Sequence, residues 1–314
     1  MKLVSIVVPV YNEEDNIAHF TESVEKVMDA LPYAYEILFI DDGSRDRSRE
    51  ILRELGASDP HVQSIFLARN CGHQIALTCG IDHADGDAVI TMDGDMQHPP
   101  ALIPTLLAKW EEGFDVVQTI RETTEGVGFL KRATSYWYYK ALNKISRVHI
   151  QEGGSDFRLM DRRALAALAE YPEVNLFLRG IVPMIGLTHD VVYYTRRQRL
   201  AGESKYPWRR MASFAWEGVT SLSARPIRLI SQMGMCISFI SGLMLIWSVI
   251  RHFIGETIVG WTSLVVSLWF LGGLILLSIG VIGEYVGKIY LEVKRRPRYL
   301  VQDFIDGNAE QKNN

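Results

Sequence analysis

The stretch VITMDGDMQHPP, residues 89–100, joins the pattern of a β-strand to a group of oxygen-bearing side chains. Its first three residues are β-branched and favour a strand, because such side chains suit a pleated sheet. Asp93 and Asp95 follow, and two prolines end the stretch. The sequence therefore predicts a buried strand that leads into an acidic loop.

Segments on both sides of this stretch repeat an alternation of strand and helix. Apolar runs predict strands at residues 3–10, 35–42, 62–69, 87–93 and 115–121, and helical spacing predicts helices at 12–31, 45–57, 73–84 and 99–113. Such alternation predicts an α/β fold with a doubly wound, mostly parallel sheet. Ligands of these sheets bind beyond the carboxyl ends of the strands, where the sequence places Asn12, Asp41, Asp42, Arg69, Asn70, Asp93, Asp95 and Arg121. Asn12 is also predicted to cap the first helix.

The composition of the 314-residue chain argues against some classes of function. Its net charge of −4 implies no nucleic-acid partner. The three cysteines, Cys71, Cys79 and Cys236, lack the spacing of a zinc site and predict neither a metal nor a disulfide. The first apolar run is short and ends in acidic residues, so it resembles a buried strand more than a signal peptide and predicts a cytoplasmic first domain.

Two late apolar runs, residues 227–250 and 261–283, are each about long enough to cross a ~30 Å hydrocarbon core as a helix. Buried core helices are the alternative, but the uncharged centres of both runs favour membrane spans. Cations flank the outer ends of the pair, whereas the connection holds only Arg251. The positive-inside rule therefore predicts a multi-pass protein of the inner (cytoplasmic) membrane with both termini in the cytoplasm. Gly272, Gly273 and Gly280 would allow close helix packing within one chain or in a homo-oligomer.

Residues 206–226 place apolar side chains on one side of a predicted helix, with Arg209 and Arg210 near its start. This pattern predicts an amphipathic helix at the membrane interface, and an ordinary core helix is the alternative. The predicted organisation is an α/β domain at 1–205, the interfacial helix at 206–226, a two-helix transmembrane hairpin at 227–287 and a basic cytoplasmic tail at 288–314.

Asp93, Asp95 and Gln97 are the candidate metal ligands. Their oxygen atoms suit Mg²⁺ or Mn²⁺. Acidic pairs are common in solvated turns, which is the alternative for this loop. Its position after an apolar strand, near other strand ends that carry acids and arginines, favours the metal.

Seven motifs resemble, in order, those of family 2 glycosyltransferases: PVYNEEDNI, DDGSRDRS, RNCGHQIAL, DGDMQHPP, GGSDFRLM, NLFLRG and RLAGESKY. With the paired apolar runs, the set is most similar to polyprenyl-phosphate glycosyltransferases, the group of dolichyl-phosphate mannose synthase and bactoprenol glucosyltransferase. The resemblance covers nearly the whole chain. It implies a GT-A-like fold for the α/β domain.

The resemblance also implies a role for each motif. The donor nucleotide would bind Pro9, Tyr11, Glu13, Asp41, Asp42, Asp93, Gly94 and Arg121, and the acceptor phosphate would bind Lys131, Arg132 and Ser155. A loop with Arg199, Ser204 and Lys205 would close over the donor. The alternatives are helix capping beside Ser44 for the acids of the second strand, a solvated helix start for the basic pair, and a flexible connector for the loop.

The implied catalytic residues are Asp156, Asp95 and Arg121. Asp156 is placed in relatives to act as a base on the acceptor, but a phosphate monoester has a second pKa of about 6 and hardly needs one. The alternatives for Asp156 are to orient Arg158 or the acceptor, or to form a structural salt bridge. His73 and His98 lie near the site, where supporting or packing roles are favoured over catalysis.

The implied function is inverting transfer of a sugar from a UDP-sugar to undecaprenyl phosphate at the cytoplasmic membrane face, with Mg²⁺ or Mn²⁺ and with glucose as the favoured sugar. One alternative is the same reaction with an aminopentose or an N-acetylhexosamine. Another is a non-catalytic membrane subunit that binds a nucleotide sugar. A processive polysaccharide synthase is disfavoured, because two spans are too few for a channel and the sequence lacks a Q-x-x-R-W motif.

Overall fold

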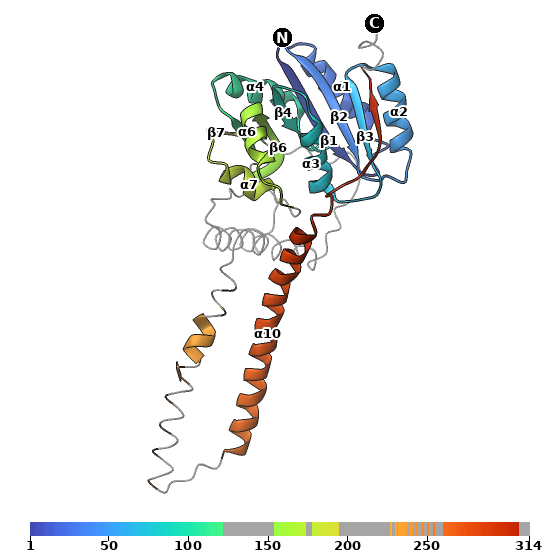
Figure 1. Ribbon diagram of the computed structural model, residues 1–314. Helices are drawn as coiled ribbons and strands as arrows, with labels where there is room; N and C mark the ends of the chain where they lie inside the picture. The colour runs from blue at the N-terminus through green and yellow to red at the C-terminus, as the bar shows by residue number, and fades with distance from the viewer. Residues whose placement is uncertain are drawn as a thin grey trace. The chain divides into compact units, whose positions relative to one another are not determined.

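The computed structural model describes residues 1–121, 154–173, 178–194 and 260–307, together with scattered positions between 227 and 254 (Figure 1). The chain divides into two compact units. One unit contains Met1–Ser213 and Pro297–Asn314, and the other contains Phe214–Arg296.

The first unit is built on a mixed eight-stranded sheet in the order β7-β5-β6-β4-β1-β2-β3-β8. Strands β4, β1, β2 and β3 run parallel, as do β5 and β7, whereas β6 and β8 run antiparallel to their neighbours. The strands are β1 (Leu3–Val10), β2 (Ala34–Asp41), β3 (Val62–Leu67), β4 (Ala88–Thr91), β5 (Val116–Arg121), β6 (Gly154–Asp161), β7 (His189–Tyr194) and β8 (Val301–Asp306). The predicted α/β fold with a mostly parallel sheet is confirmed.

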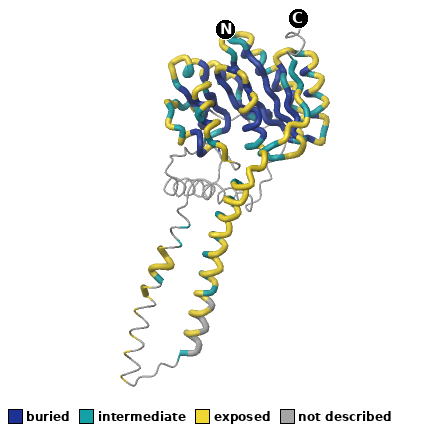
Figure 2. The backbone as a smooth tube through the Cα atoms, in the orientation of Figure 1, coloured by how far each residue is buried: buried dark blue, intermediate teal, exposed yellow. Residues whose placement is uncertain are grey.

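Helices cover both faces of this sheet, as the alternating pattern predicts (Figure 1). Side chains of β1 point alternately to the two faces, so Ile6 and Val8 join one apolar cluster and Val7 joins the other. Figure 2 shows the strands as a buried layer between partly exposed helices. On the Ile6 face lie α1 (Ile17–Met28), α2 (Ser48–Ser58), the 3₁₀ turn η1 (Pro100–Leu102) and α4 (Ile103–Glu111); on the Val7 face lie α3 (His73–His83), α6 (Arg162–Ala169) and α7 (Leu178–Met184).

Strand β6 was not predicted, and it separates two strands that the sequence pattern treats as consecutive. It pairs antiparallel with β4 on one side and with β5 on the other. The hydroxyls of Thr91 and Thr119 donate hydrogen bonds to the carbonyls of Asp156 and Phe157. Because β6 runs against its neighbours, its first residues lie at the edge where β4 and β5 end.

The prediction that Asn12 caps the first helix is wrong. Helix α1 begins at Ile17, and Asn16, which precedes it, makes no side-chain cap bond. Asn12 has a left-handed φ of 54°. Its amide donates to Ser44 Oγ at 2.9 Å, and its side-chain oxygen accepts from the Arg45 amide at 2.9 Å. Asn12 therefore joins the end of β1 to the loop after β2.

Residues near the carboxyl terminus add a strand to the same sheet, which the predicted tail at 288–314 did not anticipate. Strand β8 pairs antiparallel with β3. Arg53 of α2 forms an ion pair of 2.7 Å with Asp303, and Ile305 packs against one apolar cluster. Strand β8 is thus an integral part of the α/β unit.

The second unit contains the long helix α10 (Trp261–Lys294) of 34 residues. At about 1.5 Å per residue it is about 51 Å long. In the described part of the chain it alone is long and apolar enough to cross a membrane, with the candidate span at Phe270–Lys294. The first predicted span, residues 227–250, is described only at scattered positions, and the predicted interfacial helix at 206–226 lies outside the described residues.

Gly43, after β2, is expected to tolerate no side chain. Its φ is +75°, and an added Cβ would lie 2.6 Å from the amide nitrogen of Asn70. Gly113 is the matched control, because its φ is +98° but nothing lies within 4 Å of an added Cβ. Gly43→Ala should reduce the free energy of unfolding by about 1–3 kcal/mol more than Gly113→Ala does. Chemical unfolding of the two variants in detergent tests this, and equal losses would contradict the close approach.

Candidate active site

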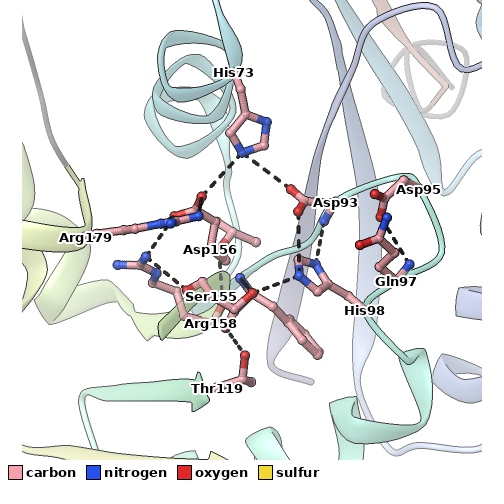
Figure 3. Close-up of polar contacts among 12 residues, drawn as sticks. His73, Asp93, Asp95, Gln97, His98, Thr119, Ser155, Asp156, Arg158 and Arg179 are labelled. Atoms are coloured by element: carbon pink, nitrogen blue, oxygen red, sulfur yellow. Dashed lines mark hydrogen bonds and ion pairs between the residues drawn. The ribbon is translucent and has the colours of Figure 1, made fainter. Parts of the chain in front are cut away.

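The candidate site lies at the sheet edge where the parallel strands end and β6 begins. Figure 3 shows the side chains that gather there from the loop after β4, the start of α3, the start of β6 and α7. These segments are far apart in the sequence. The sheet topology brings them together, because the carboxyl ends of β4 and β5 share an edge with the amino end of β6.

Asp93 is the half-exposed carboxylate of this site, with 34% of its side chain accessible. One carboxylate oxygen lies 3.4 Å from Nε2 of His73, and the other lies 3.6 Å from Nε2 of His98. Its backbone amide donates to Nδ1 of His98 at 3.0 Å. Both the backbone and the side chain of Asp93 are therefore held by imidazoles.

The loop that follows Asp93 fits a divalent cation by its donor chemistry. Asp95 accepts a 3.1 Å hydrogen bond from the Gln97 amide, and Met96 between them has a left-handed φ of 60°. Gln97 is 4% exposed, and its side-chain nitrogen has no hydrogen-bond partner among the described residues. Turning this amide by 180° would put the oxygen in that place.

The structure itself shows no metal-binding cluster of three or more His, Cys, Asp or Glu residues in the described ranges. Magnesium is commonly bound through only one or two protein carboxylates, and substrate phosphates supply further ligands. Asp93, Asp95 and Gln97 suit that arrangement.

Asp156 is the buried anion of the site, at 3% exposure. Arg179 of α7 binds both of its oxygens, at 3.0 Å through Nε and at 2.7 Å through Nη2. Arg158 adds a bond of 3.1 Å, and Gln74 of α3 donates at 3.2 Å. His73 lies 3.6 Å away, so this histidine stands between Asp156 and Asp93 (Figure 3).

These contacts fix the charges of the cluster. Burial alone would raise the pKa of Asp156, but the nearby His73 and the charges of Arg179 and Arg158 hold that pKa well below its usual value. Burial lowers the pKa of His73, yet Asp156 and Asp93 outweigh it and the net shift is upward. A carboxylate with so low a pKa and a bidentate arginine partner is a poor proton acceptor. This geometry disfavours Asp156 as a general base and favours its alternative role as an anchor for arginine.

The acids at the end of β2 are bonded inside the protein. Asp41 is 0% exposed, pairs with Arg49 at 2.6 Å and accepts from the Ser44 amide at 3.1 Å. Asp42 is 3% exposed and accepts from the amides of Cys71 and Gly72 at 2.6 and 2.9 Å. Burial raises the pKa of Asp42 despite these amide bonds. Their side chains would meet a nucleotide only if these contacts changed.

Other residues that were predicted to bind the donor nucleotide lie close to this edge. Pro9 is buried in β1, and Tyr11 just beyond it is 42% exposed. Glu13 accepts from the Asn16 side chain at 2.6 Å. Gly94 lies against β1, where an added Cβ would come within 3.3 Å of Val10. Arg121, the last residue predicted to bind the donor nucleotide, is exposed at the end of β5.

Several predicted residues lie outside the described part of the chain. The acceptor-phosphate pair Lys131 and Arg132 and the closing-loop residues Arg199, Ser204 and Lys205 lie outside the described residues. Ser155 is described, and its hydroxyl lies 2.8 Å from Nε2 of His98.

Arg179 and Gln74 are site residues that the sequence analysis did not assign. Arg179 belongs to the quoted motif NLFLRG, where it is the one charged residue in an apolar segment. A charge in such a segment needs a partner of opposite charge, and Asp156 in GGSDFRLM is an acid for which a structural salt bridge was one predicted role. Gln74 lies in the motif RNCGHQIAL, but nothing in its local pattern indicates a partner.

Replacement of Asp156 by Asn should destabilise the fold. It would leave Arg158, only 2% exposed, without its counter-charge, and breaking such a pair costs about 3–5 kcal/mol. Because the folded-state pKa of Asp156 is depressed, its stabilisation is present above the unfolded-state value of about 3.9 and is lost only as pH falls through the folded-state pKa.

The difference in unfolding free energy between wild type and Asp156→Asn should be larger at pH 6 than at pH 8, because Asp156 also stabilises the protonated form of His73, whose pKa it raises. Asp303→Asn is the control, because its ion pair with Arg53 is exposed to solvent and contributes little to stability. A loss for Asp156→Asn no larger than that of the control would contradict the ion-pair account.

The sequence was compared with known families and proteins. Residues 5–168 match the profile of the family described as Glycosyl transferase family 2. A prophage-derived bactoprenol glucosyl transferase of Shigella flexneri is 44% identical over 306 residues, which covers 97% of this chain and 99% of that protein. The uncharacterized glycosyltransferase YkcC of Bacillus subtilis is 44% identical over 299 residues, or 95% of this chain and 93% of that protein.

A solved structure has a similar fold. Mannosyl-3-phosphoglycerate synthase from Rubrobacter xylanophilus superposes with a TM-score of 0.52 at 17% identity, over 74% of this chain and 75% of that chain. This likeness concerns the fold alone. It agrees with the predicted GT-A-like α/β domain.

Proposed function

The chain belongs to glycosyl transferase family 2, and we propose that it transfers a sugar from a UDP-sugar to undecaprenyl phosphate at the cytoplasmic face of the membrane. Relatives named bactoprenol glucosyl transferase, at 44% identity over nearly their whole length, support a lipid-carrier acceptor and favour glucose as the sugar. Other sugars, such as an aminopentose or an N-acetylhexosamine, remain the alternative for the same site.

One observation carries this proposal. The loop of Asp93 and Asp95, whose oxygen atoms suit a metal ion, lies at the same sheet edge as Arg179, which Asp156 holds by an ion pair. His73 stands 3.4 Å from Asp93 and 3.6 Å from Asp156, and Asp156 holds Arg179. The reaction requires both features, since its donor and its acceptor each carry phosphate. An arginine guanidinium binds phosphate oxygens well because it is planar and permanently charged.

The proposed reaction is a single displacement. An oxygen of the acceptor phosphate attacks C1 of the sugar, the bond from C1 to the diphosphate oxygen breaks, and UDP leaves with the bonding electrons, so the configuration at C1 inverts. The acceptor phosphate has a second pKa of about 6 and is largely dianionic at neutral pH. It needs no base, which agrees with the depressed pKa of Asp156.

The residues of the chain would position the reactants. A divalent cation, Mg²⁺ or Mn²⁺, would be held by Asp93, Asp95 and Gln97 and would offset the charge of the diphosphate. Asp156 orients Arg179, whose side chain is 44% exposed and whose charge favours a bound phosphate. Arg121, at the end of β5, supplies further positive charge near the leaving group.

Attachment to the membrane explains how a soluble donor meets an insoluble acceptor. Helix α10 is the candidate for one span, and residues 227–250 are proposed as the other, with residues 206–226 at the interface and both termini in the cytoplasm. A non-catalytic nucleotide-sugar-binding subunit is the competing function. The complete set of Asp93, Asp95, Gln97 and Arg121 favours the enzyme.

Sugar transfer to undecaprenyl phosphate should depend on a divalent cation and on Asp95. The test uses a panel of radiolabelled nucleotide sugars with the full chain in detergent, with Mg²⁺, with Mn²⁺ and with EDTA. Asp95→Asn should reduce kcat/KM by about 10²–10³-fold, the effect of removing one charge-stabilising group. Asp303→Asn, which breaks a surface ion pair, should leave the rate unchanged.

Labelled lipid from one donor, lost with EDTA and with Asp95→Asn, would establish the reaction and identify the sugar. Folded protein that forms no labelled lipid from any donor would contradict the transferase and favour the binding subunit.

A further inference from the structure

His98 is a buried histidine that connects the two halves of the site. It is 5% exposed and lies just after the acidic loop. Its Nδ1 accepts a hydrogen bond of 3.0 Å from the backbone amide of Asp93, and its Nε2 lies 2.8 Å from the hydroxyl of Ser155 (Figure 3). One ring therefore touches a candidate metal ligand and a candidate acceptor-binding residue.

The hydrogen bonds assign the tautomer of His98. A nitrogen that accepts an amide N–H cannot itself carry a hydrogen, so the ring hydrogen of the neutral form lies on Nε2. Nε2 then donates to Ser155.

The hydrogen bonds of Ser155 likewise show whether its hydroxyl acts as donor or acceptor. Its oxygen accepts from Nε2–H of His98 and from the Phe157 amide at 3.2 Å. A hydroxyl oxygen has two acceptor lone pairs, and both are then occupied. The hydroxyl hydrogen is left to be donated, and none of its hydrogen bonds in the described part of the chain uses it. Ser155 thus offers a donor, the group that an anionic phosphate oxygen requires.

The imidazole of His98 has little freedom to turn. Phe157 stacks on it with ring centroids 5.2 Å apart and an interplanar angle of 24°, and Tyr194 meets it edge-on at 6.1 Å. If the imidazole rotated away from its present rotamer, it would have to displace these aromatic side chains.

We propose that His98 is a positioning residue with two separate tasks: Nδ1 holds the backbone of Asp93 for the cation, and Nε2–H keeps Ser155 as a hydrogen-bond donor to the acceptor phosphate. The inference rests on the proposed function for the identity of that phosphate. It deepens that function, because it assigns each ring nitrogen to a different substrate-binding task. Neither task requires His98 to gain or lose a proton.

Two substitutions separate the tasks, because each retains one polar position of the ring. His98→Asn places an amide oxygen near the position of Nδ1 and loses the reach to Ser155. His98→Gln places its amide near Nε2 and loses the acceptor for the Asp93 backbone. Ser155→Ala removes the hydroxyl alone, and His61→Asn is the control, since His61 is also stacked on an aromatic ring, Tyr35, but belongs to a different contact.

The readouts are equilibrium affinities of the full chain in detergent, independent of turnover. Electron paramagnetic resonance measures Mn²⁺ binding, and calorimetry measures binding of undecaprenyl phosphate. His98→Asn and Ser155→Ala should each weaken the binding of undecaprenyl phosphate about tenfold, which is the effect of a lost hydrogen bond to a charged group. The affinity for Mn²⁺ should change little. His98→Gln should weaken the binding of Mn²⁺ about tenfold, because it removes a group that orients a metal ligand. Its effect on the affinity for the lipid should be smaller.

The double variant His98→Asn with Ser155→Ala should bind the lipid no more weakly than Ser155→Ala alone, since both changes remove the same donor. His61→Asn should leave both affinities unchanged.

A purely structural role would give a different result: both His98 variants would weaken both ligands alike, or the effects of His98→Asn and Ser155→Ala would add in full. Either result overturns the proposal, as does Ser155→Ala with unchanged lipid affinity. Wild-type protein that binds Mn²⁺ but no undecaprenyl phosphate would instead contradict the proposed acceptor, and with it the role assigned to Ser155.

Discussion

The ion pair between Asp156 and Arg179 is the interaction on which the rest of the site depends. Asp156 is buried, and a buried carboxylate is tolerated only when charge and hydrogen bonds compensate it. Arg179, Arg158 and Gln74 supply this compensation from α7, β6 and α3. The need to neutralise one carboxylate therefore fixes three elements relative to one another, and His73 extends the network to Asp93.

The direction of β6 determines where this ion pair lies. Ser155 and Asp156 begin the strand, and because the strand is antiparallel to β4, they reach the same edge as the loop with Asp93 and Asp95. Had β6 been parallel, its first residues would lie at the opposite edge of the sheet. The reversal thus places Arg179, which Asp156 holds, and the loop of Asp93 and Asp95 at one edge of the sheet, as the proposed phosphate acceptor and diphosphate donor require.

The sequence predicted the parts of the fold that depend on local pattern. Apolar runs placed β1 to β5, helical spacing placed the helices between them, and the parallel arrangement followed from their alternation. Strands β6 and β7 and the reversed strand β8 were not predicted, because their places in the sheet depend on pairing with distant segments. In the site, Asp93 and Asp95 were correctly placed after β4. Arg158 was proposed as a partner of Asp156, but Arg179 and Gln74 were missed, because contacts between segments that are remote in the sequence produce no local spacing pattern.

The central claim is that Asp156 is a permanent anion that positions arginine, and the most direct test is the ¹³Cγ chemical shift of Asp156 between pH 5 and pH 8. Asp156→Asn assigns the resonance by its loss. The account predicts a shift that stays at the ionised value across this range, because the pKa of Asp156 lies well below its usual value. A titration midpoint within the range would show a carboxyl group that exchanges a proton near neutral pH, and it would contradict the account in favour of a general base.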